Sequence, residues 1–410
     1  MNELPEKRPS FKKGILIGIL LTSAAFLLIG LILIKTGTIR VLDGDNRFPN
    51  DEILQKLNFT TELIGAEYIE EVPAEDLEDG LFRGLAAALG DPYARYFSKD
   101  EFKEQMTRVT RQYYGIGATL TQDEKTKRVR VVYVYDDSPA KKEGLKEGDE
   151  ILSVNGHDAT SMDLDALVEL IQGDEGTVVD IDVRRENVED PIEMHMTRAV
   201  ISMPTVQHSM FSDHVGYIYI TKFASNTPEE FHQALEELTE NGMEALIIDL
   251  RYNTGGIFES CINILDELLP KGVLVYTENR NGERAYEYSD DEHQVKLPMA
   301  VLINEDSASA SEIFAGAIRD YEWGTLIGTT TFGKGLVQQT FSLRDGSAFK
   351  LTVERYFTPS GDNIQEKGID PDIKLEYDYS GDPEATEYDY GCDNQVQKAI
   401  ELLSDELSGK

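Results

Sequence analysis

The sequence is poor in the residues that build metal and redox centres. Its 410 residues include only two cysteines and six histidines. The histidines are scattered and no HExxH or CxxC spacing occurs, so no cluster would hold a catalytic or structural metal ion. Cys261 and Cys392 lie far apart and in no motif, although an oxidising compartment would allow a bridge between them. We expect two unrelated thiols, one on a core helix and one in the tail, and no cofactor.

Basic residues are also few. Lysine and arginine number 39 against 76 aspartates and glutamates, which gives a net charge of −37. Nucleic-acid binding needs a basic surface, so this class of partner is excluded. The charge suits a soluble surface kept apart by like charge, and it gives no indication of a substrate. The length allows two or three domains.

One long apolar stretch occupies residues 14–34. It holds no charged residue over 21 positions, which is enough to cross a bilayer core as a helix. Lysines and arginines precede it in residues 1–13, so the positive-inside rule predicts a cytoplasmic tail there and an extracytoplasmic location for the rest. The alternative is a cleaved signal peptide. The run is longer than the apolar part of such a peptide and no A-x-A site follows, so we expect a single-pass protein of the cell membrane.

A serine-rich junction follows a buried strand in the C-terminal half. The apolar run at residues 298–303 predicts the strand, and apolar residues then recur at helical spacing from Ser309 onward. A hydroxyl at a helix N-terminus lies near free backbone N–H groups and the positive end of the dipole, which favour developing negative charge. Ser309 is therefore a candidate nucleophile. The alternative is a helix cap or a small packing residue.

A lysine stands in an unusual setting shortly afterwards. Lys334 lies between Gly333 and Gly335 in a segment that is otherwise apolar and β-branched. Burial there would lower its pKa from about 10.4 toward neutrality, and the free amine could act as a base. A serine with a lysine base is a known variant of the serine nucleophile. The alternative is a solvated lysine in a glycine-rich turn.

Together these two stretches resemble the C-terminal processing peptidases, also called tail-specific proteases. That family carries its nucleophile as the middle serine of SASASE, its general-base lysine in an FGKG motif 25 residues later, and a glutamine four residues further on. Those positions hold Ser309, Lys334 and Gln338 here. The resemblance implies that Ser309 is the nucleophile, that Lys334 is the base and that Gln338 orients the lysine.

Two further motifs extend the resemblance. EALIIDLRYNTGG at residues 244–256 is similar to the family's DLRxNxGG, whose first glycine supplies an oxyanion-hole N–H. This implies an oxyanion hole built by Gly255 and by Ala310, the residue after the nucleophile. The alternative for Gly255 is an ordinary turn at the end of a strand. Residues 355–373 resemble the family's YxTPxGxxI and GIxPD segment.

Residues 105–198 resemble a PDZ domain. The signature is GLKxGDxIxxVNG at residues 144–156, followed by an amphipathic helix from Leu164 to Ile171. Such a domain binds a peptide C-terminus as an added strand, here between that helix and the strand after the turn. Four turn residues are expected to bind the terminal carboxylate: Tyr114, Gly115, Ile116 and Gly117. The alternative is a PDZ-like fold that packs on the protease and binds nothing.

Three positions depart from the family pattern. Gln172 replaces an arginine that commonly follows the PDZ helix, which puts ligand sensing through that position in doubt. Leu336 replaces a serine after FGKG, and Asp306 replaces a glycine before SASASE.

The order of patterns predicts the architecture. Alternating strands and helices predict an α/β protease core with a mixed sheet at residues 199–378, with the PDZ domain inserted before it. Residues 35–104 are predicted to be a helical region that serves as scaffold or dimer contact. Residues 379–410 are predicted to be an acidic segment with a final amphipathic helix, which could pack on a partner subunit of a homodimer.

These observations predict a membrane-anchored serine endopeptidase that acts outside the cytoplasm. Its partner would be a protein or peptide substrate with a free C-terminus, which the PDZ domain holds while the dyad cuts at or near the tail. One alternative is a membrane-tethered PDZ adaptor with an inactive protease core. Another is a serine protease whose base is one of three histidines: His208, His214 or His232.

Overall fold

The computed structural model describes residues 48–409, apart from 124, 212–213, 291–293, 383–384 and 386–387. The predicted cytoplasmic tail and membrane helix, residues 1–34, lie outside the described residues. Within the described ranges, no helix is both long and apolar enough to span a bilayer. The chain divides into two compact units, Met1–Glu78 and Asp79–Lys410.

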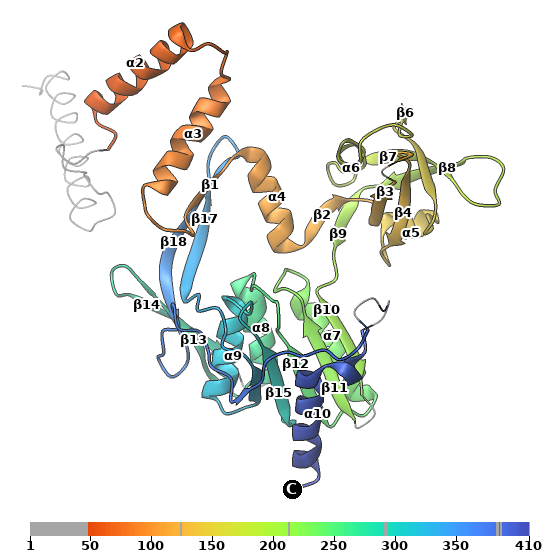
Figure 1. Ribbon diagram of the computed structural model, residues 1–410, viewed down its shortest axis with the longest axis vertical. Coiled ribbons are helices and arrows are strands. Elements are labelled where there is room, and N and C mark those ends of the chain that lie inside the picture. Colours follow the sequence, from red (N-terminus) through yellow and green to blue (C-terminus); the bar gives the residue numbers. More distant parts are fainter. Residues whose placement is uncertain are drawn as a thin grey trace, which may run out of the picture. The chain divides into compact units, whose positions relative to one another are not determined.

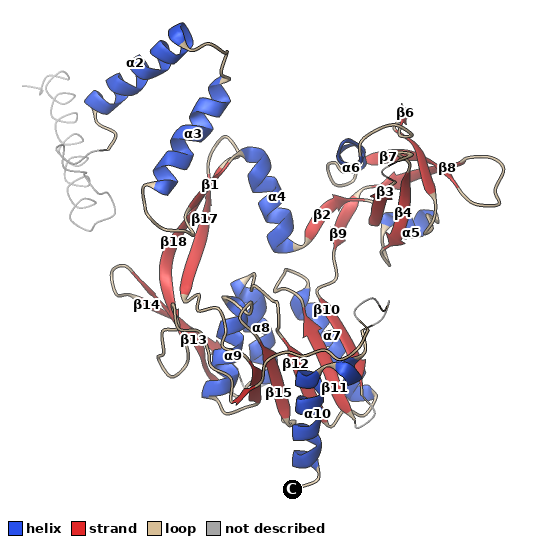
Figure 2. Ribbon diagram, in the orientation of Figure 1, coloured by secondary structure: helices blue, strands red, loops and turns tan. Residues whose placement is uncertain are grey.

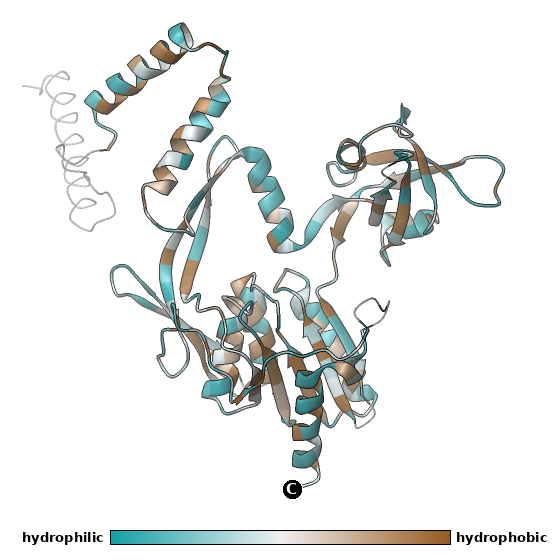
Figure 3. Ribbon diagram, viewed as in Figure 1, coloured by the Kyte–Doolittle hydropathy of each residue, from teal (hydrophilic) through white to brown (hydrophobic). Residues whose placement is uncertain are grey.

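The first unit contains helix α2 (Asp51–Glu67) and the start of α3 (Ala74–Ala87). Asn50 caps α2, because its side chain accepts a hydrogen bond from the Ile53 N–H at 2.9 Å. Hydrophobic and hydrophilic residues alternate along α2, and none of its residues is buried (Figure 3). Its apolar residues Ile53, Leu57 and Ile64 are only partly buried.

The second unit contains a short strand that was not predicted from the sequence. Residues 35–104 were expected to be a helical region, but β1 (Arg95–Phe97) is a strand between α3 and α4 (Lys99–Thr110). It pairs antiparallel with β18 (Ala348–Phe357) and buries two aromatic side chains. Such a short strand exists only because of a partner some 250 residues away, so local helical periodicity could not indicate it.

The predicted PDZ domain contains a six-stranded sheet and two helices, and one strand on each side of it joins a separate two-stranded pair (Figure 2). Its elements are β2 (Gln112–Gly115), β3 (Ala118–Gln122), β4 (Val129–Val134), α5 (Pro139–Glu143), β5 (Glu150–Val154), β6 (His157–Asp158), α6 (Leu164–Ile171), β7 (Val178–Arg184), β8 (Ile192–Thr197) and β9 (Ala199–Ser202). The bounds of α6 confirm the predicted helix. Strands β2 and β9 pair with each other.

The predicted protease core is built on a six-stranded sheet (Figure 1). Its order is β10 (Val206–Met210), β11 (Val215–Ile220), β12 (Ala245–Asp249), β15 (Met299–Ile303), β16 (Thr325–Gly328) and β19 (Ile373–Lys374). All neighbours are parallel except β10 and β11. Every residue of β12 and β15 is buried, which explains their continuous apolar sequences.

Helices cover both faces of this sheet. One apolar cluster joins alternate strand residues to α7 (Thr227–Glu240), α8 (Phe258–Leu268) and α9 (Ala310–Asp320). The other alternate residues pack against α10 (Asn394–Leu407). This arrangement confirms the α/β core.

A second, antiparallel sheet lies beside the first. It contains β1, β18, β13 (Gly272–Asn279) and β14 (Arg284–Ser289), and β17 (Leu336–Ser342) pairs with β18. The register of β17 shifts between Val337 and Gln338, which marks a bulge.

A buried arginine ties the C-terminal segment to the central sheet. The Arg251 guanidinium, just after β12, bonds Asp249 at 2.6 Å and Asp393, the N-cap of α10, at 2.8 Å. Its Nη1 also donates to Gln395 Oε1 at 2.9 Å. Burial raises the pKa of Asp393. The hydrogen bond and positive charge of Arg251, together with the bonds from the Tyr388 hydroxyl and the Val396 N–H, outweigh burial, so the pKa lies below the ordinary 3.8.

We expect Arg251→Met to lower the free energy of unfolding by about 3–5 kcal/mol, because two buried carboxylates lose their cation. Denaturant unfolding followed by circular dichroism measures this loss. The exposed Arg284, which pairs with Glu278 at 2.8 Å, supplies the control. Arg284→Met should cost less than about 1 kcal/mol. Equal effects of the two substitutions would contradict this account.

The lowered pKa of Asp393 also predicts how the stability of the fold changes with pH. A carboxyl whose folded pKa is lowered stabilises the fold above its unfolded pKa and loses that contribution as pH falls through the folded pKa. The difference between the parent and Arg251→Met should therefore shrink below pH 3.8.

Candidate active site

Only one of the three serines in SASAS is available for chemistry. Ser307 and Ser311 are fully buried, and their hydroxyls donate to the carbonyl oxygens of Leu250 and Asn253, each at 2.8 Å. Ser309 is partly exposed and lines a cavity of about 670 Å³. The flanking serines hold the turn in place, and the middle one faces the open space.

Ser309 stands in a strained backbone conformation at the start of α9. Its φ is +57° and its ψ is −113°, values uncommon for a residue with a side chain. Three groups hold this turn. The Ser309 N–H donates to Glu312 Oε2 at 2.8 Å, and the Ser309 carbonyl accepts from the Glu312 N–H at 2.9 Å and from the Tyr356 hydroxyl at 3.1 Å.

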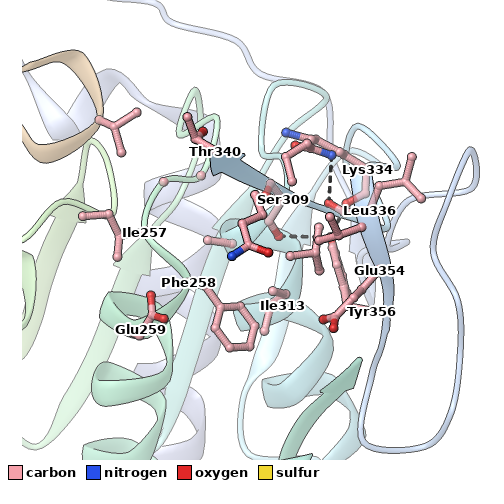
Figure 4. A pocket seen from close by; sticks show the side chains of 18 of the residues that line it. Ile257, Phe258, Glu259, Ser309, Ile313, Lys334, Leu336, Thr340, Glu354 and Tyr356 are labelled. Carbon is pink, nitrogen blue, oxygen red and sulfur yellow. Dashed lines mark hydrogen bonds between the residues drawn. The ribbon is translucent and has the colours of Figure 1, made fainter. Parts of the chain in front are cut away.

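Lys334 lies in the loop between β16 and β17 and lines the same cavity (Figure 4). Burial lowers the pKa of its amine, and the positive charge of Lys350 lowers it further, while Glu312 acts in the opposite direction. Its Nζ lies 5.1 Å from the centre of the Tyr93 ring. No hydrogen bond joins Lys334 Nζ to Ser309 Oγ in the part of the chain that the structure describes. The two groups predicted to form the dyad are thus brought to one cavity but are not bonded to each other.

Glu312 connects the serine turn to the lysine loop. This role was not predicted from the sequence. The carboxylate is fully buried and accepts four hydrogen bonds. Its donors are the Ser309 N–H (2.8 Å), the Lys334 N–H (2.8 Å), the Gly333 N–H (2.6 Å) and the Thr331 hydroxyl (2.7 Å). Its place as the last residue of SASASE was the only signal in the sequence.

Tyr356 of β18 adds a second link. Its buried hydroxyl bridges the carbonyl oxygens of Ser309 and Lys334. Burial raises its pKa, so the phenol stays protonated and remains a donor.

The predicted oxyanion-hole residues lie beside the serine but are not equivalent. A Cβ on Gly255 would lie 2.9 Å from the Ser309 Cβ and 2.6 Å from the Ala308 oxygen, so only glycine fits at this φ of +90°. The Gly255 N–H donates to Asn253 Oδ1 at 2.9 Å. The Ala310 N–H, in the first turn of α9, has no hydrogen-bond acceptor among the described residues. The Ala310 N–H is therefore free to bind an oxyanion here, whereas the Gly255 N–H is already bonded to Asn253.

Gln338 lines the cavity but does not contact the lysine amine through a hydrogen bond in the described chain. Its Nε2 donates to the Leu336 carbonyl at 3.3 Å, next to the bulge of β17. The expected orienting role of Gln338 stays a prediction.

The remaining walls of the cavity suit a peptide. Apolar side chains come from α8, α9 and the β17–β18 pair: Phe258, Ile313, Leu336, Val337 and Val353. Charged side chains lie at Lys222, Glu259, Glu287, Lys350 and Glu354. Such a cavity can hold side chains of both kinds while the backbone passes Ser309.

The three candidate histidines lie elsewhere in the described structure. His208 contacts Glu237 at 3.1 Å, His232 contacts Glu267 at 2.7 Å, and His214 contacts the Gly242 carbonyl at 3.0 Å. None of them lines the cavity that holds Ser309. This arrangement does not favour a histidine base.

The cysteines are both free. Cys261 lies buried on α8, where its Sγ donates to the Ala310 carbonyl at 3.2 Å, and Cys392 lies in the C-terminal segment. The expected pair of unrelated thiols is confirmed.

The PDZ groove lies where it was expected, between β3 and α6. A small cavity of about 120 Å³ is lined by Tyr113, Ile116, Ala118, Leu120, Val168, Ile171 and Gln172. Ile116 is buried, while Tyr114 is half exposed. Gly117 has φ +81°, and a Cβ there would lie 2.3 Å from the Ser138 Cβ, so the turn requires glycine. Carboxylate binding by Tyr114–Gly117 stays a prediction.

We expect Glu312→Gln to lower kcat/KM by about 100-fold. An amide nitrogen in place of either carboxylate oxygen faces two donors, so the serine and lysine segments lose their common anchor. Initial rates of peptide hydrolysis measure kcat/KM, and thermal unfolding measures the effect on the fold. The control is Glu305→Gln, because Glu305 is exposed and its carboxylate accepts from the nearby Thr329 hydroxyl without joining the serine turn to the lysine loop. Unchanged kcat/KM in Glu312→Gln would contradict the anchoring role.

Comparison with known proteins gives a family. The model for peptidase family S41 matches residues 214–375, that for the PDZ domain matches 130–185, and that for the activating protease CtpB N-terminal domain matches 37–101. The carboxy-terminal processing protease CtpB of Bacillus subtilis is 36% identical over 329 residues, covering 79% of this chain and 68% of that protein. CtpA of the same organism is 35% identical over 347 residues, covering 84% and 74%. The chain therefore belongs to the carboxy-terminal processing proteases of peptidase family S41, and it is a serine-type peptidase with a PDZ domain.

Proposed function

We propose that this peptidase cuts protein substrates at or near their C-terminal tails, with Ser309 as nucleophile and Lys334 as general base. The observation that carries the proposal is the shared cavity. It holds the one accessible serine of SASAS together with a lysine whose pKa is lowered by burial.

The chemistry follows from these two groups. The neutral Lys334 amine takes the proton from Ser309 Oγ as the oxygen attacks the peptide carbonyl. The Ala310 N–H stabilises the oxyanion, and the Gly255 N–H joins it when it leaves Asn253 Oδ1. The lysine ammonium then gives its proton to the leaving amine. A water molecule, deprotonated by the same lysine, hydrolyses the acyl-enzyme.

The PDZ domain supplies tail selection in this proposal. A substrate C-terminus adds as a strand beside β3, with its carboxylate at the turn of Tyr114–Gly117 and its last side chain in the apolar groove. Because Gln172 lines that groove and carries no charge, we expect selection there by shape and apolar contact.

We propose that residues 14–34 anchor the chain in the cell membrane, with the catalytic part outside the cytoplasm. The support is the uncharged 21-residue run and the cations that precede it.

We expect Ser309→Ala and Lys334→Ala each to lower hydrolysis of an unstructured protein with an apolar tail by more than about 1000-fold, with unchanged circular dichroism. Substitution of His208, His214 or His232 by alanine supplies the control and should leave the rate unchanged. Full activity of Lys334→Ala would sink the dyad. A full-length chain that binds the tail peptide but never cuts it would instead favour the PDZ adaptor.

The lowered pKa of Lys334 predicts the pH dependence. Activity should rise with pH as the ammonium loses its proton, and the midpoint of this acid limb should lie below the 10.5 of an ordinary lysine. A kcat/KM profile against pH measures it. A limb centred at or above 10.5 would contradict the burial of the base.

Membrane attachment has a direct test. The full chain should stay in the membrane pellet after alkaline carbonate extraction, and a chain lacking residues 1–40 should not. Added protease should degrade the catalytic part in intact protoplasts. A full chain that is released by carbonate would refute the anchor.

A further inference from the structure

Tyr93 lies against the lysine of the active site although 241 residues separate them in the sequence. The Lys334 Nζ is 5.1 Å from the centre of the Tyr93 ring, within the range of a cation–π contact. Tyr93 lies in a turn fixed by its own N–H, which donates to Asp91 Oδ1 at 2.8 Å. The proposed mechanism gives this residue no role.

The strand that follows Tyr93 brings further aromatic faces to nearby cations. In β1, Arg95 pairs with Lys350 of β18. The Phe97 ring lies 5.0 Å from the Arg95 guanidinium and 5.7 Å from the Lys350 Nζ. Residues 93–97 thus place aromatic rings against three cations, of which Lys334 and Lys350 line the active-site cavity. Pairing of β1 with β18 fixes the segment, so the position of the Tyr93 ring is set by the sheet.

We propose that Tyr93 is a positioning residue for the general base: its ring holds the Lys334 ammonium in the substrate-free enzyme, away from a hydrogen bond with Ser309 Oγ. The proposal rests on the proposed role of Lys334. A ring face attracts the ammonium but not the neutral amine. Loss of the proton therefore releases the side chain, which can then turn toward Ser309.

Several other groups act on the same amine. Glu312 of α9 and Lys350 of β18 influence it most directly, with opposite signs. The hydroxyl of Tyr356 donates a hydrogen bond to the Lys334 carbonyl oxygen. The cavity also carries Lys222, Glu259, Glu287 and Glu354, and Asp91 and Arg95 lie near Lys350. The ring of Tyr93 adds to the stabilisation of the charged form that Glu312 supplies, against burial and Lys350.

The test removes the aromatic face and keeps an apolar side chain. Leucine at position 93 still covers the amine from water, so Tyr93→Leu isolates the loss of the cation–π contact. Tyr93→Phe keeps the ring without the hydroxyl. Tyr133→Leu, at an exposed tyrosine of the PDZ domain, is the matched control.

Protonation is read directly, without hydrolysis. In the full chain carrying Ser309→Ala, brief acetylation with acetic anhydride at a series of pH values, followed by mass spectrometry, gives the midpoint for Lys334. We expect Tyr93→Leu to lower this midpoint by roughly half to one and a half pH units, and Tyr93→Phe and Tyr133→Leu to leave it unchanged. If Tyr93→Leu unfolds, Tyr93→Met provides the same comparison.

The results separate this proposal from the proposed function. An unchanged midpoint in Tyr93→Leu overturns it, and so does a raised midpoint, which would mean that the ring only excludes water. In hydrolysis assays with Ser309 intact, the acid limb of kcat/KM should shift in the same direction as the midpoint. If Lys334→Ala retained full hydrolysis, the dyad would fail, but the acetylation midpoint would still decide whether the ring holds the ammonium.

Discussion

The buried carboxylate of Glu312 is the constraint on which the active site depends. A charged group without water is costly unless hydrogen bonds replace its solvation. No cation is paired with it among the described residues; four donors from two separate segments solvate it instead. Two of those donors are the backbone N–H groups of Ser309 and Lys334. Movement of either segment would therefore leave the buried carboxylate without part of its hydrogen bonding. This links the positions of the proposed nucleophile and base.

The parallel sheet makes this linkage feasible. Ser309 follows β15 and Lys334 follows β16, and these strands are neighbours with Ile303 beside Gly328. Because parallel strands end at the same edge, the two loops that leave them meet there. The serine turn also rests on the loop after β12, where Asn253 accepts from Ser311 and Gly255 approaches the Ser309 Cβ. Three consecutive strands of the sheet thus contribute to one site.

The protonation of Lys334 is set by a balance of opposing effects. Burial and Lys350 disfavour the ammonium, and Glu312 favours it. In this structure the amine lies against Tyr93, Gly255 donates to Asn253 and Gln338 bonds to Leu336. The groups expected to work together are gathered, but their hydrogen bonds are made with other partners. Catalysis in the proposed mechanism therefore requires small local rearrangements within a rigid frame.

Much of the fold could be predicted locally. Strong periodicity gave the correct bounds for α6, and the continuous apolar run at residues 298–303 indicated β15 as a buried strand. The predicted helical region at residues 35–104 was wrong at β1, because a strand of three residues has no periodicity of its own. Its pairing with β18 is decided by contacts between distant segments.

The sequence by itself determined which residues are candidates for the chemistry, since the spacing of Ser309, Lys334 and Gln338 and the motif at Gly255 are visible without coordinates. It also determined the PDZ domain and the α/β core. Only the tertiary structure decided what surrounds those residues: that Ser307 and Ser311 are buried, that Glu312 anchors both loops and that Tyr93 contacts Lys334. The physical reason is that strand pairing and burial join segments far apart in the chain, and local patterns of residues do not encode those contacts.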